Sequence, residues 1–508
     1  MDGFSKKEYL SLKMPTEDVA LSDQRRIELA LNTLGYAPVT FPLKVLRRLY
    51  PLCRNAGFDI TVTLVHREHD WVVTDVEPGN TTAHHYGLAV DYGSTTLVMQ
   101  LVDMNSGAVI GEEFAVNGQT AYGTDILTRI TYAKENPSHG EKLRKATTQT
   151  FDLLLDRLTE STGIHANNCP VMILSGNTTM IHFLLGLDAW TVFASPYAPV
   201  TAAPGFLWGE ELGMAFDGLV YTIPAASNYV GGDIVSGLLV LDIHKQDKPR
   251  MFFDIGTNGE LVIGSKDWMM AGAGAAGPAL EGYISKFGMR AAPGAVDSVQ
   301  IRGKELTFTT IGSQKPVGIC GSGIIDLLAQ MRREGWIDMA GNLEPAASGR
   351  IVFVPEEGEY AAVYATAEET AGQPLYFSQT DIQQYLDTKA AAYTMVDCLL
   401  ETAGVAAEDL AHVYLSGAFP AHSDLESAIT IGIFPDLPRE KYTVVKNTSL
   451  DGARTLLLAH SRLQEAKELA ENIYCVQFAS IPDFLIRMQA AKFIPHTDMA
   501  RFPSVTTK

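Results

Sequence analysis

The chain has few cysteines, and they lie far apart. Five of the 508 residues are cysteine, and the two closest in sequence, Cys398 and Cys475, are separated by 77 positions. No C-x-x-C clip or ferredoxin-type run is present to hold zinc or an iron–sulfur cluster. We therefore expect no iron–sulfur cluster in this chain.

Positive charge and long apolar stretches are also scarce. Lys and Arg number 39 against 59 Asp and Glu, which gives a net charge of −20. So acidic a chain repels the phosphate backbones of nucleic acids and anionic membrane surfaces. No 18 apolar residues follow one another, and the first residues lack the apolar core of a signal peptide. We expect a soluble, cytoplasmic protein that binds neither nucleic acid nor membrane.

The length of the chain predicts several domains. We place a small α+β domain over residues 1–85, a first larger half over 86–245, and a second half with insertions and a C-terminal segment over 246–508. In the small domain the apolar spacing predicts two helices and two strands, over Ser22–Leu34, Pro42–Tyr50, Asp59–Val65 and Asp70–Val76. Further along, helical spacing is clear over Leu143–Leu158 and Asp381–Glu401.

A short motif of strand, acidic-glycine turn and strand occurs twice. The apolar stretch Leu88–Val90 runs into DYGSTT (Asp91–Thr96), and 163 positions after Asp91 the stretch Met251–Phe253 runs into DIGTNGE (Asp254–Glu260). Another apolar stretch follows each turn. This internal repeat predicts two related halves in an α/β fold.

Turns of this kind suit phosphate and magnesium. A glycine after the acid lets the backbone turn tightly, so that N–H groups and hydroxyls converge on a phosphate while the carboxylate holds Mg²⁺. The alternative is an ordinary hairpin, above all at Asn258-Gly259, but the pair of turns favours a phosphate site. The candidate catalytic and metal-binding residues are Asp91 and Asp254, with Glu260 as a further catalytic acid. The candidate phosphate-binding residues are Gly93, Ser94, Thr95, Thr96, Gly256, Thr257, Asn258 and Gly259.

Further strand-turn-helix units end in small residues. Open α/β sheets bind ligands at the carboxyl ends of their strands, so these turns are candidates for the base and ribose side of a nucleotide, although close helix packing also explains such residues. They are Gly321, Ser322 and Gly323 in one unit and Ser416, Gly417 and Ala418 in another. Asp233 stands before a helical stretch; it is a candidate catalytic acid or base or metal ligand, or the N-cap of that helix.

Two other patterns are weaker. Gly272, Gly274 and Gly277 spell G-x-G-x-x-G, but no compact strand-helix-strand unit surrounds them, which disfavours a dinucleotide fold. His66 and His69 lack a third metal ligand nearby, so we interpret both as solvent-exposed.

Taken in order, these motifs resemble a known family. The paired turns with a later small-residue turn resemble the ASKHA superfamily of acetate and sugar kinases, Hsp70 and actin, which implies two duplicated RNase H-like halves. More closely, the chain is similar to the reductive activators of corrinoid proteins, and the match extends from about Tyr86 to the C-terminus. It rests on DIGTNGE, AGPALEG, GICGSGIIDLL, VYLSGAF, DLESAITIGIFP and NTSLDGA. Residues 1–85 look like that family's small middle domain.

The resemblance implies an activity. Such activators use ATP and Mg²⁺ to return an inactive cob(II)amide to the cob(I)amide state. The resemblance also implies a corrinoid protein as partner and a homodimer. Family members generally carry an iron–sulfur ferredoxin domain, so without one we expect the electron to come from a separate low-potential ferredoxin or flavoprotein. Two alternatives stay open: a metabolite kinase of the same fold, with Asp233 as its base, and a nucleotide-sensing binding protein.

Overall fold

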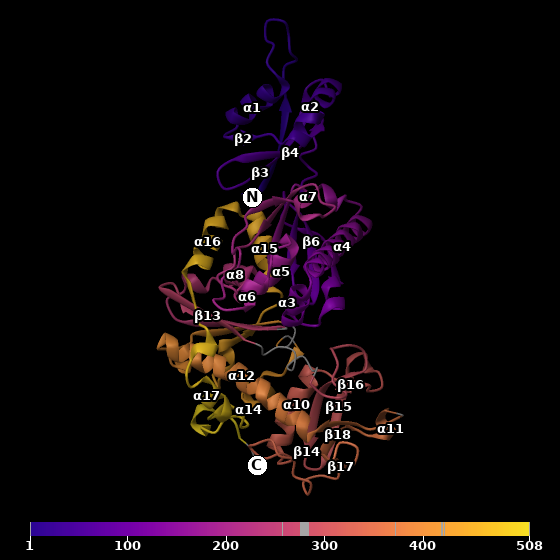
Figure 1. Ribbon diagram of the computed structural model, residues 1–508, viewed down its shortest axis with the longest axis vertical. Helices are drawn as coiled ribbons and strands as arrows, with labels where there is room; N and C mark the ends of the chain where they lie inside the picture. Colours follow the sequence, from indigo (N-terminus) through magenta and orange to yellow (C-terminus); the bar gives the residue numbers. More distant parts are fainter. Residues whose placement is uncertain are drawn as a thin grey trace. The chain divides into compact units, whose positions relative to one another are not determined.

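The computed structural model in Figure 1 describes residues 2–256, 258–274, 284–370, 372–417, 420 and 422–506. The chain forms two compact units, and each unit contains two separate segments of the sequence. Residues up to Asp242 form the first unit together with Thr448–Asn472, and Ile243–Asn447 form the second together with the residues from Ile473 on. Local sequence patterns do not predict that Thr448–Asn472 returns to the first unit.

The start of the chain folds into a small sheet with two helices packed on it. The sheet has the strand order β1-β3-β4-β2. Ser22 caps α1, because its side-chain oxygen accepts the backbone N–H of Arg25 at 3.2 Å. The elements are β1 (Ser5–Ser11), α1 (Asp23–Thr33), β2 (Val39–Thr40), α2 (Leu43–Asn55), β3 (Asp59–His66) and β4 (Trp71–Pro78). The two helices and two strands predicted for this region are confirmed.

The larger sheet of the first unit has the order β7-β6-β5-β8-β10-β9. Strands β5, β6 and β7 form an antiparallel meander, and β8 and then β10 continue the sheet parallel to β5. The bounds are β5 (Tyr86–Tyr92), β6 (Thr96–Asp103), β7 (Val109–Val116), β8 (Val171–Gly176), β9 (Phe206–Trp208) and β10 (Leu219–Thr222). The carboxyl ends of β5, β8 and β10 therefore share one edge.

Helices cover both faces of this sheet. Alternate residues of β5 face opposite sides: Tyr92 contacts α4, its hydroxyl oxygen 3.0 Å from that of Thr147, whereas a Cβ at Gly87 would lie 3.0 Å from Leu457 on α15. Helix α8 packs against α15. The helices of this unit's larger part are α3 (Ile126–Glu135), α4 (Pro137–Thr162), α5 (Thr178–Leu185), α6 (Trp190–Phe193), α7 (Gly209–Leu212), α8 (Gly232–Leu241), α15 (Thr448–Leu458) and α16 (Leu463–Asn472).

The large sheet of the second unit repeats this topology over five of its six strands. Its order is β21-β20-β11-β12-β13-β22, with an antiparallel meander of β11, β12 and β13 and with β20 and then β21 parallel to β11. Strand β11 thus corresponds to β5, and β20 to β8. The bounds are β11 (Arg250–Ile255), β12 (Gly259–Ser265), β13 (Trp268–Gly274), β20 (His412–Ser416), β21 (Tyr442–Val444) and β22 (Ile473–Cys475). The prediction of two duplicated α/β halves is confirmed.

Two small sheets and several helices complete the second unit around one apolar core. One small sheet has the order β15-β14-β16, and the other has the order β17-β18-β19. Their strands are β14 (Ala295–Arg302), β15 (Glu305–Thr310), β16 (Gly318–Ile319), β17 (Ile351–Val354), β18 (Glu359–Ala365) and β19 (Leu375–Ser378). The helices include α10 (Gly321–Arg333), α11 (Ala367–Thr370), α12 (Gln379–Ala403), α14 (Leu425–Ile431) and α17 (Phe484–Ala491). The helices predicted within α4 and α12 are confirmed.

The glycine-rich G-x-G-x-x-G stretch is not part of a dinucleotide fold. Gly272 and Gly274 lie in β13, which pairs antiparallel with β12. A Cβ at Gly272 would lie 2.5 Å from the ring of Phe478, and one at Gly274 would lie 2.6 Å from Sδ of Met395. These glycines therefore allow close packing, while Gly277 lies outside the described residues.

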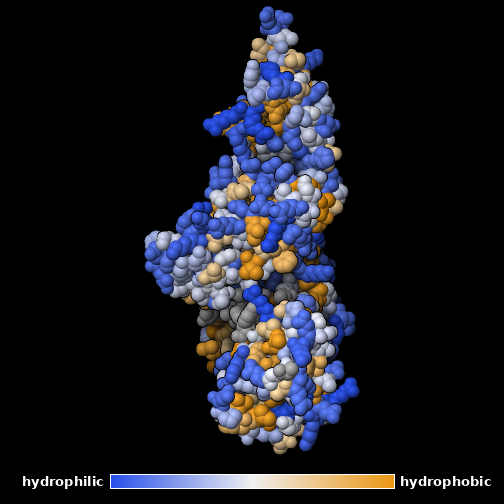
Figure 2. Space-filling view, turned by 90° about the vertical axis from the view of Figure 1, so that its right-hand side faces the viewer, coloured by the Kyte–Doolittle hydropathy of each residue, from blue (hydrophilic) through white to orange (hydrophobic). Residues whose placement is uncertain are grey.

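Among the residues that the structure describes, no helix is both long and apolar enough to cross a bilayer. The face drawn in Figure 2 is mostly hydrophilic, with hydrophobic residues in small patches between charged ones. Scattered apolar side chains of this kind are normal on folded proteins.

Candidate functional site

The first aspartate turn follows directly on β5. A Cβ at Gly93 would lie 2.6 Å from the carbonyl oxygen of Thr96, so the turn requires a glycine. Two fully buried side chains hold the turn: Asn117 Nδ2 donates to the Gly93 carbonyl at 3.0 Å, and Arg129 Nη1 donates to the Ser94 carbonyl at 2.6 Å. These two hydrogen bonds therefore restrain the backbone of the turn.

Three buried serines connect to the carboxylate of Asp91 at this turn. The Ser449 hydroxyl, in the first turn of α15, donates to Oδ1 of Asp91 at 2.7 Å. Its Oγ lies 2.8 Å from Oγ of Ser175 at the end of β8, which in turn lies 2.8 Å from Oγ of Ser236 in α8. None of the three serines is more than 7% exposed. A continuous chain of hydroxyl groups thus reaches Asp91 from inside the unit.

Asp233 lies beside the same strand ends. Strands β5 and β8 pair Asp91 with Ser175, and Asn177 is the first residue after β8. A Cβ at Gly231 would lie 2.7 Å both from Cα of Asn177 and from Oδ1 of Asp233. The N-cap of α8 is Gly231 and Asp233 is the helix's second residue, so the N-cap alternative for Asp233 is wrong.

The second aspartate turn occupies the equivalent place in the other sheet. Asp254 and Glu260 stand directly opposite each other on β11 and β12, and Glu260 is only 7% exposed. The backbone N–H of Gly256 donates to the carbonyl of Asn258 at 3.0 Å and closes the turn. The turn is therefore a hairpin, as the alternative held, and its role in phosphate binding stays a prediction. Thr257 lies outside the described residues.

The strand next to this hairpin delivers the last predicted turn. Asp254 pairs with Ser416 on the parallel strand β20. Gly417 has φ of +101°, and a Cβ there would lie 2.1 Å from the carbonyl oxygen of Ile255. No other residue fits, so bare backbone lies against the second aspartate turn. Ala418 lies outside the described residues.

The small residues at the start of α10 have a packing role. A Cβ at Gly323 would lie 2.3 Å from the carbonyl oxygen of Val296 on β14, and Oγ of Ser322 lies 3.4 Å from Sγ of Cys320. The N-terminus of α10, with Gly321 as its first residue, is thus anchored on the small sheet of β14. Close packing accounts for these residues, and their nucleotide role stays a prediction.

The structure therefore gathers the predicted residues into two sets. Thr95 belongs to the first, since its carbonyl accepts the N–H of Asn117 at 2.8 Å. The two sets lie at corresponding strand ends of two sheets that share the order of five strands. The first set is Asp91, Gly93, Ser94, Thr95, Thr96 and Asp233, and the second is Asp254, Gly256, Asn258, Gly259, Glu260, Ser416 and Gly417.

The cysteines do not gather at either set. Cys53, Cys169, Cys320 and Cys398 are buried and Cys475 is half-buried, all as free thiols. Burial raises the pKa of Cys53 and Cys398 to about 11 and that of Cys169 to about 12. Because the thiolate is the form that binds metals or attacks electrophiles, these three thiols act as apolar packing groups.

The interpretation of His66 as solvent-exposed is wrong, while His69 is exposed. The His66 ring stacks on Trp71 with centroids 4.3 Å apart, and its Nδ1 lies 3.1 Å from Nδ1 of His460. The reason is long-range: His460 follows α15, which the sequence alone does not place near β3. Burial is the main cause that lowers the pKa of both rings, and it lowers that of His460 to about 4.

We expect this histidine pair to make stability depend on pH. An unfolded histidine has a pKa of about 6.5, so below that pH the unfolded chain binds more protons than the folded one. The free energy of unfolding is then highest above pH 6.5 and falls as the pH drops toward 4. Urea unfolding at several pH values should give a weaker dependence for His460→Gln than for the wild type. An unchanged dependence would contradict a role for the pair.

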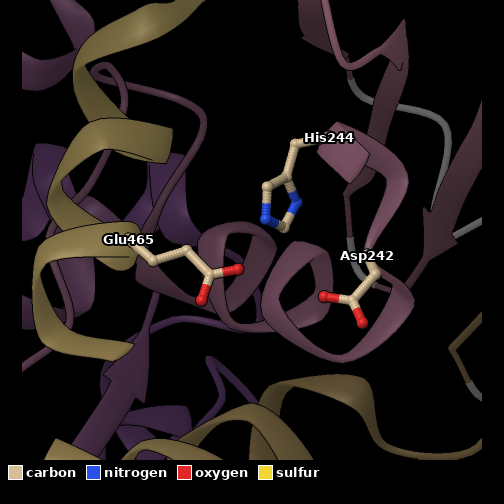
Figure 3. Close-up of side chains that lie close together, drawn as sticks. All are labelled: Asp242, His244 and Glu465. Atoms are coloured by element: carbon tan, nitrogen blue, oxygen red, sulfur yellow. The ribbon is translucent and has the colours of Figure 1, made fainter. Parts of the chain in front are cut away.

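Asp242, His244 and Glu465 lie close together, and the two acids form ion pairs with a shared arginine. Figure 3 shows Asp242, His244 and Glu465. The Arg462 guanidinium donates from Nη2 to Oδ1 of Asp242 at 2.9 Å and from Nε to Oε2 of Glu465 at 2.7 Å. The two carboxylates thus share one cation, and this arrangement gives the cluster a structural explanation.

Sequence reasoning missed five residues that hold the first turn. They are buried and connect to residues 91–96 through hydrogen bonds: Asn117, Arg129, Ser175, Ser236 and Ser449. A signal existed for two of them, since Ser175 stands in a strand-turn-helix unit and Ser449 in NTSLDGA. Nothing in the sequence connects either of them to Asp91.

The fold and the sequence both match a known family. Two duplicated α/β halves of this topology define an ASKHA-type protein. Models of the RACo family match the chain as its linker region over residues 1–83, its middle region over 86–246 and its C-terminal ASKHA domain over 248–506. The chain belongs to the RACo family. The N-terminal residues match the family's linker region, where we expected its middle domain.

Named relatives agree with this assignment. The corrinoid activation enzyme RamQ of Eubacterium limosum is 30% identical over 409 residues, which span 79% of this chain and 69% of RamQ. The Co(II) methylated amine-specific corrinoid protein reductase of Methanosarcina barkeri is 25% identical over 431 residues, 76% of this chain and 73% of that protein. A solved structure of a reductive activator for corrinoid, iron–sulfur protein matches with a TM-score of 0.88 at 36% identity, over 99% of this chain and 81% of that one.

Proposed function

We propose that this protein is an ATP-dependent activator of a corrinoid protein. It promotes the return of an inactive cob(II)amide to the cob(I)amide state, a one-electron reduction of cobalt. The electron comes from a separate low-potential donor, a ferredoxin or a flavoprotein. Membership of the RACo family and the names of two relatives support the substrate class.

One observation supports the nucleotide chemistry. Asp91 and Asp254 stand in acidic-glycine turns at corresponding strand ends of two sheets that share the order of five strands. The duplication gives the chain two related groups, each of a kind that contacts phosphate. Either turn alone has a simpler explanation as a hairpin.

The residues present fit a bound nucleotide and its metal ion. Carboxylate oxygens are the ligands that Mg²⁺ prefers, and Asp91, Asp254 and Glu260 supply them. Gly93 and Gly417 let the backbone turn where a Cβ would collide with the carbonyl oxygens of Thr96 and Ile255, and the Cβ position of Gly256 has open space around it. Next to Ser449, Oγ1 of Thr448 is buried and has no hydrogen-bond partner among the described residues, and a phosphate oxygen would satisfy it.

Each residue then has a role in the proposed reaction. Bound Mg²⁺ would neutralise charge on the phosphates and ease transfer of the terminal phosphoryl group to water. Asp91 and Asp254 would each offer a carboxylate to Mg²⁺, and the backbone N–H groups of the two turns would bind phosphate oxygens. Glu260, buried opposite Asp254, orients the attacking water.

Nucleotide turnover is useful only if it changes the partner. The protein must bind the corrinoid protein with an affinity that depends on its nucleotide state, since an equal affinity in both states would shift no equilibrium. In the favoured complex the cobalt accepts one electron from the donor more readily. We propose that the active form is a homodimer.

The test is ATP hydrolysis under anaerobic conditions, with the cobalt spectrum followed at the same time. The purified protein is combined with ATP, Mg²⁺, a cob(II)amide-loaded corrinoid protein and a reduced ferredoxin. We expect the corrinoid protein to stimulate hydrolysis and Co(I), or methyl-Co(III) when a methyl donor is present, to appear. Omitting ATP should prevent the change in cobalt state.

Other outcomes would contradict the proposal. Rapid phosphorylation of a small metabolite, without any response of the cobalt spectrum, would establish a kinase. Binding of ATP with no turnover and no response to any corrinoid protein would establish a nucleotide sensor. Size measurement in solution would test the homodimer independently.

A further inference from the structure

We propose that Ser449, supported by Ser175 and Ser236, is a positioning residue that prepares Asp91 for Mg²⁺. This inference rests on the proposed nucleotide site. None of the three serines is expected to touch the metal ion or the nucleotide. They act through the orientation of one carboxylate.

Each serine hydroxyl has one proton to donate, and this sets the direction of the hydrogen bonds between the three serines and Asp91. An ionised carboxylate only accepts, so the single proton of the Ser449 hydroxyl points to Oδ1 of Asp91. Ser175 Oγ has two acceptors within reach, Ser449 Oγ at 2.8 Å and the Gly232 carbonyl at 3.3 Å. Its proton goes to the nearer Ser449, and Ser236 then donates to Ser175 over 2.8 Å. All three donors thus point toward the charge. Hydrogen bonds aligned in this way polarise one another, and in a buried chain each becomes stronger.

Close packing of two helices makes this chain possible. Gly452 follows Ser449 by three residues, so both lie on the same face of α15. A Cβ at Gly452 would lie only 2.3 Å from the carbonyl oxygen of Ser236 on α8. Without a side chain there, α15 approaches α8 closely enough for Ser449 and Ser236 to reach Ser175 from either side.

The arrangement leaves Asp91 an ordered carboxylate at little cost. One oxygen, Oδ1, is engaged by Ser449 from within the unit, which restricts rotation of the side chain. A metal ion then binds a ligand that is already oriented, and it does not have to immobilise it. Partners that orient a metal-binding carboxylate typically change metal affinity by about 10–100-fold when they are removed.

The serine chain also starts at a special place in the sequence. Helix α15 is the segment with which the chain re-enters the first unit, at Thr448. The residue after this entry point is the one that binds Asp91. Binding of Mg²⁺ by the oriented Asp91 carboxylate would therefore also stabilise the first turn of α15.

The test measures Mg²⁺ binding directly. Calorimetric titration of Mg²⁺ into the full-length protein with ATP present should give about a tenfold weaker affinity for Ser449→Ala. Ser449→Thr keeps the hydroxyl and should restore the affinity to within about threefold of the wild type. Ser236→Ala, two hydrogen bonds away, should weaken Mg²⁺ binding in the same direction but less. Ser348→Ala removes another buried serine, which donates to the Lys304 carbonyl at 3.1 Å, and should leave Mg²⁺ binding unchanged.

Two further readouts separate positioning from simple destabilisation. At saturating Mg²⁺, ATP hydrolysis by Ser449→Ala should recover most of its kcat, because the defect is in metal binding. Hydrogen exchange of the first turn of α15 should slow on addition of Mg²⁺ and ATP in the wild type and much less in Ser449→Ala. If the wild type binds no Mg²⁺ and ATP, the proposed function fails. If it binds them and Ser449→Ala binds equally well, this inference fails while the function stands.

Discussion

Asp91→Asn is expected to lower corrinoid-stimulated ATP hydrolysis by about 100-fold or more. The substitution removes the negative charge that holds Mg²⁺ and keeps the size of the side chain. An asparagine oxygen still accepts the hydrogen bond from Ser449, so the hydroxyl chain and the fold should persist. The measurement is kcat for ATP in the presence of a cob(II)amide-loaded corrinoid protein, with thermal unfolding as a check on the fold.

Asp254→Asn should have a similar effect, since Asp254 stands at the corresponding strand end of the second sheet. Asp152→Asn provides the matched control. Asp152 lies on α4, accepts the N–H of Ala215 at 2.7 Å, and belongs to neither turn. We expect its ATP hydrolysis to equal that of the wild type. Full activity in both Asp91→Asn and Asp254→Asn would refute the assignment of the site.

Local features of the fold were predictable from the sequence because their causes are local. The apolar stretches before Asp91 and Asp254 became β5 and β11, and their repetition indicated two sheets of the same topology. Ser22 caps α1 as its place before a helical pattern suggests. The two aspartate turns were identifiable because an acid followed by glycine after a buried strand restricts the backbone in a recognisable way.

Contacts between distant segments were not predictable. Ser449 meets Asp91 across 358 positions, and His460 meets His66 across 394. Both contacts depend on the return of α15 to the first unit, for which no local pattern provides a signal. Asp233 is a further example, because two residues of difference in the start of α8 decide between an N-cap and a side chain beside the candidate site.

Lys389 is another residue whose role only the fold reveals, and Lys389→Met is expected to destabilise the second unit strongly. A lysine on a long helix is normally a solvated group, but this one is completely buried in α12. Its ammonium group donates to three backbone carbonyls, those of Ala491, Phe493 and Pro495, at 2.5, 2.7 and 2.5 Å. Three acceptors match the three N–H donors of a charged lysine.

These carbonyls need the lysine as a donor because they lie at or beyond the end of α17. Ala491 is the last residue of α17, so its carbonyl lacks a partner within the helix. A cation at the C-terminal end of a helix is also favoured by the helix dipole. Methionine would fill the space without donating, and each buried carbonyl left unpaired costs about 1–3 kcal/mol. We therefore expect a loss of about 3 kcal/mol or more in the free energy of unfolding of this unit.

A second lysine provides the control for this prediction. Lys492, just after α17, pairs with Asp387, and its side chain is 31% exposed. Because ion pairs of this kind contribute about 1 kcal/mol or less, Lys492→Met should barely change the urea midpoint. Hydrogen exchange should locate the effect of Lys389→Met in residues 484–496, where the segment would lose protection. Equal midpoints for the two variants would mean that the buried ammonium does not hold the C-terminal segment in place.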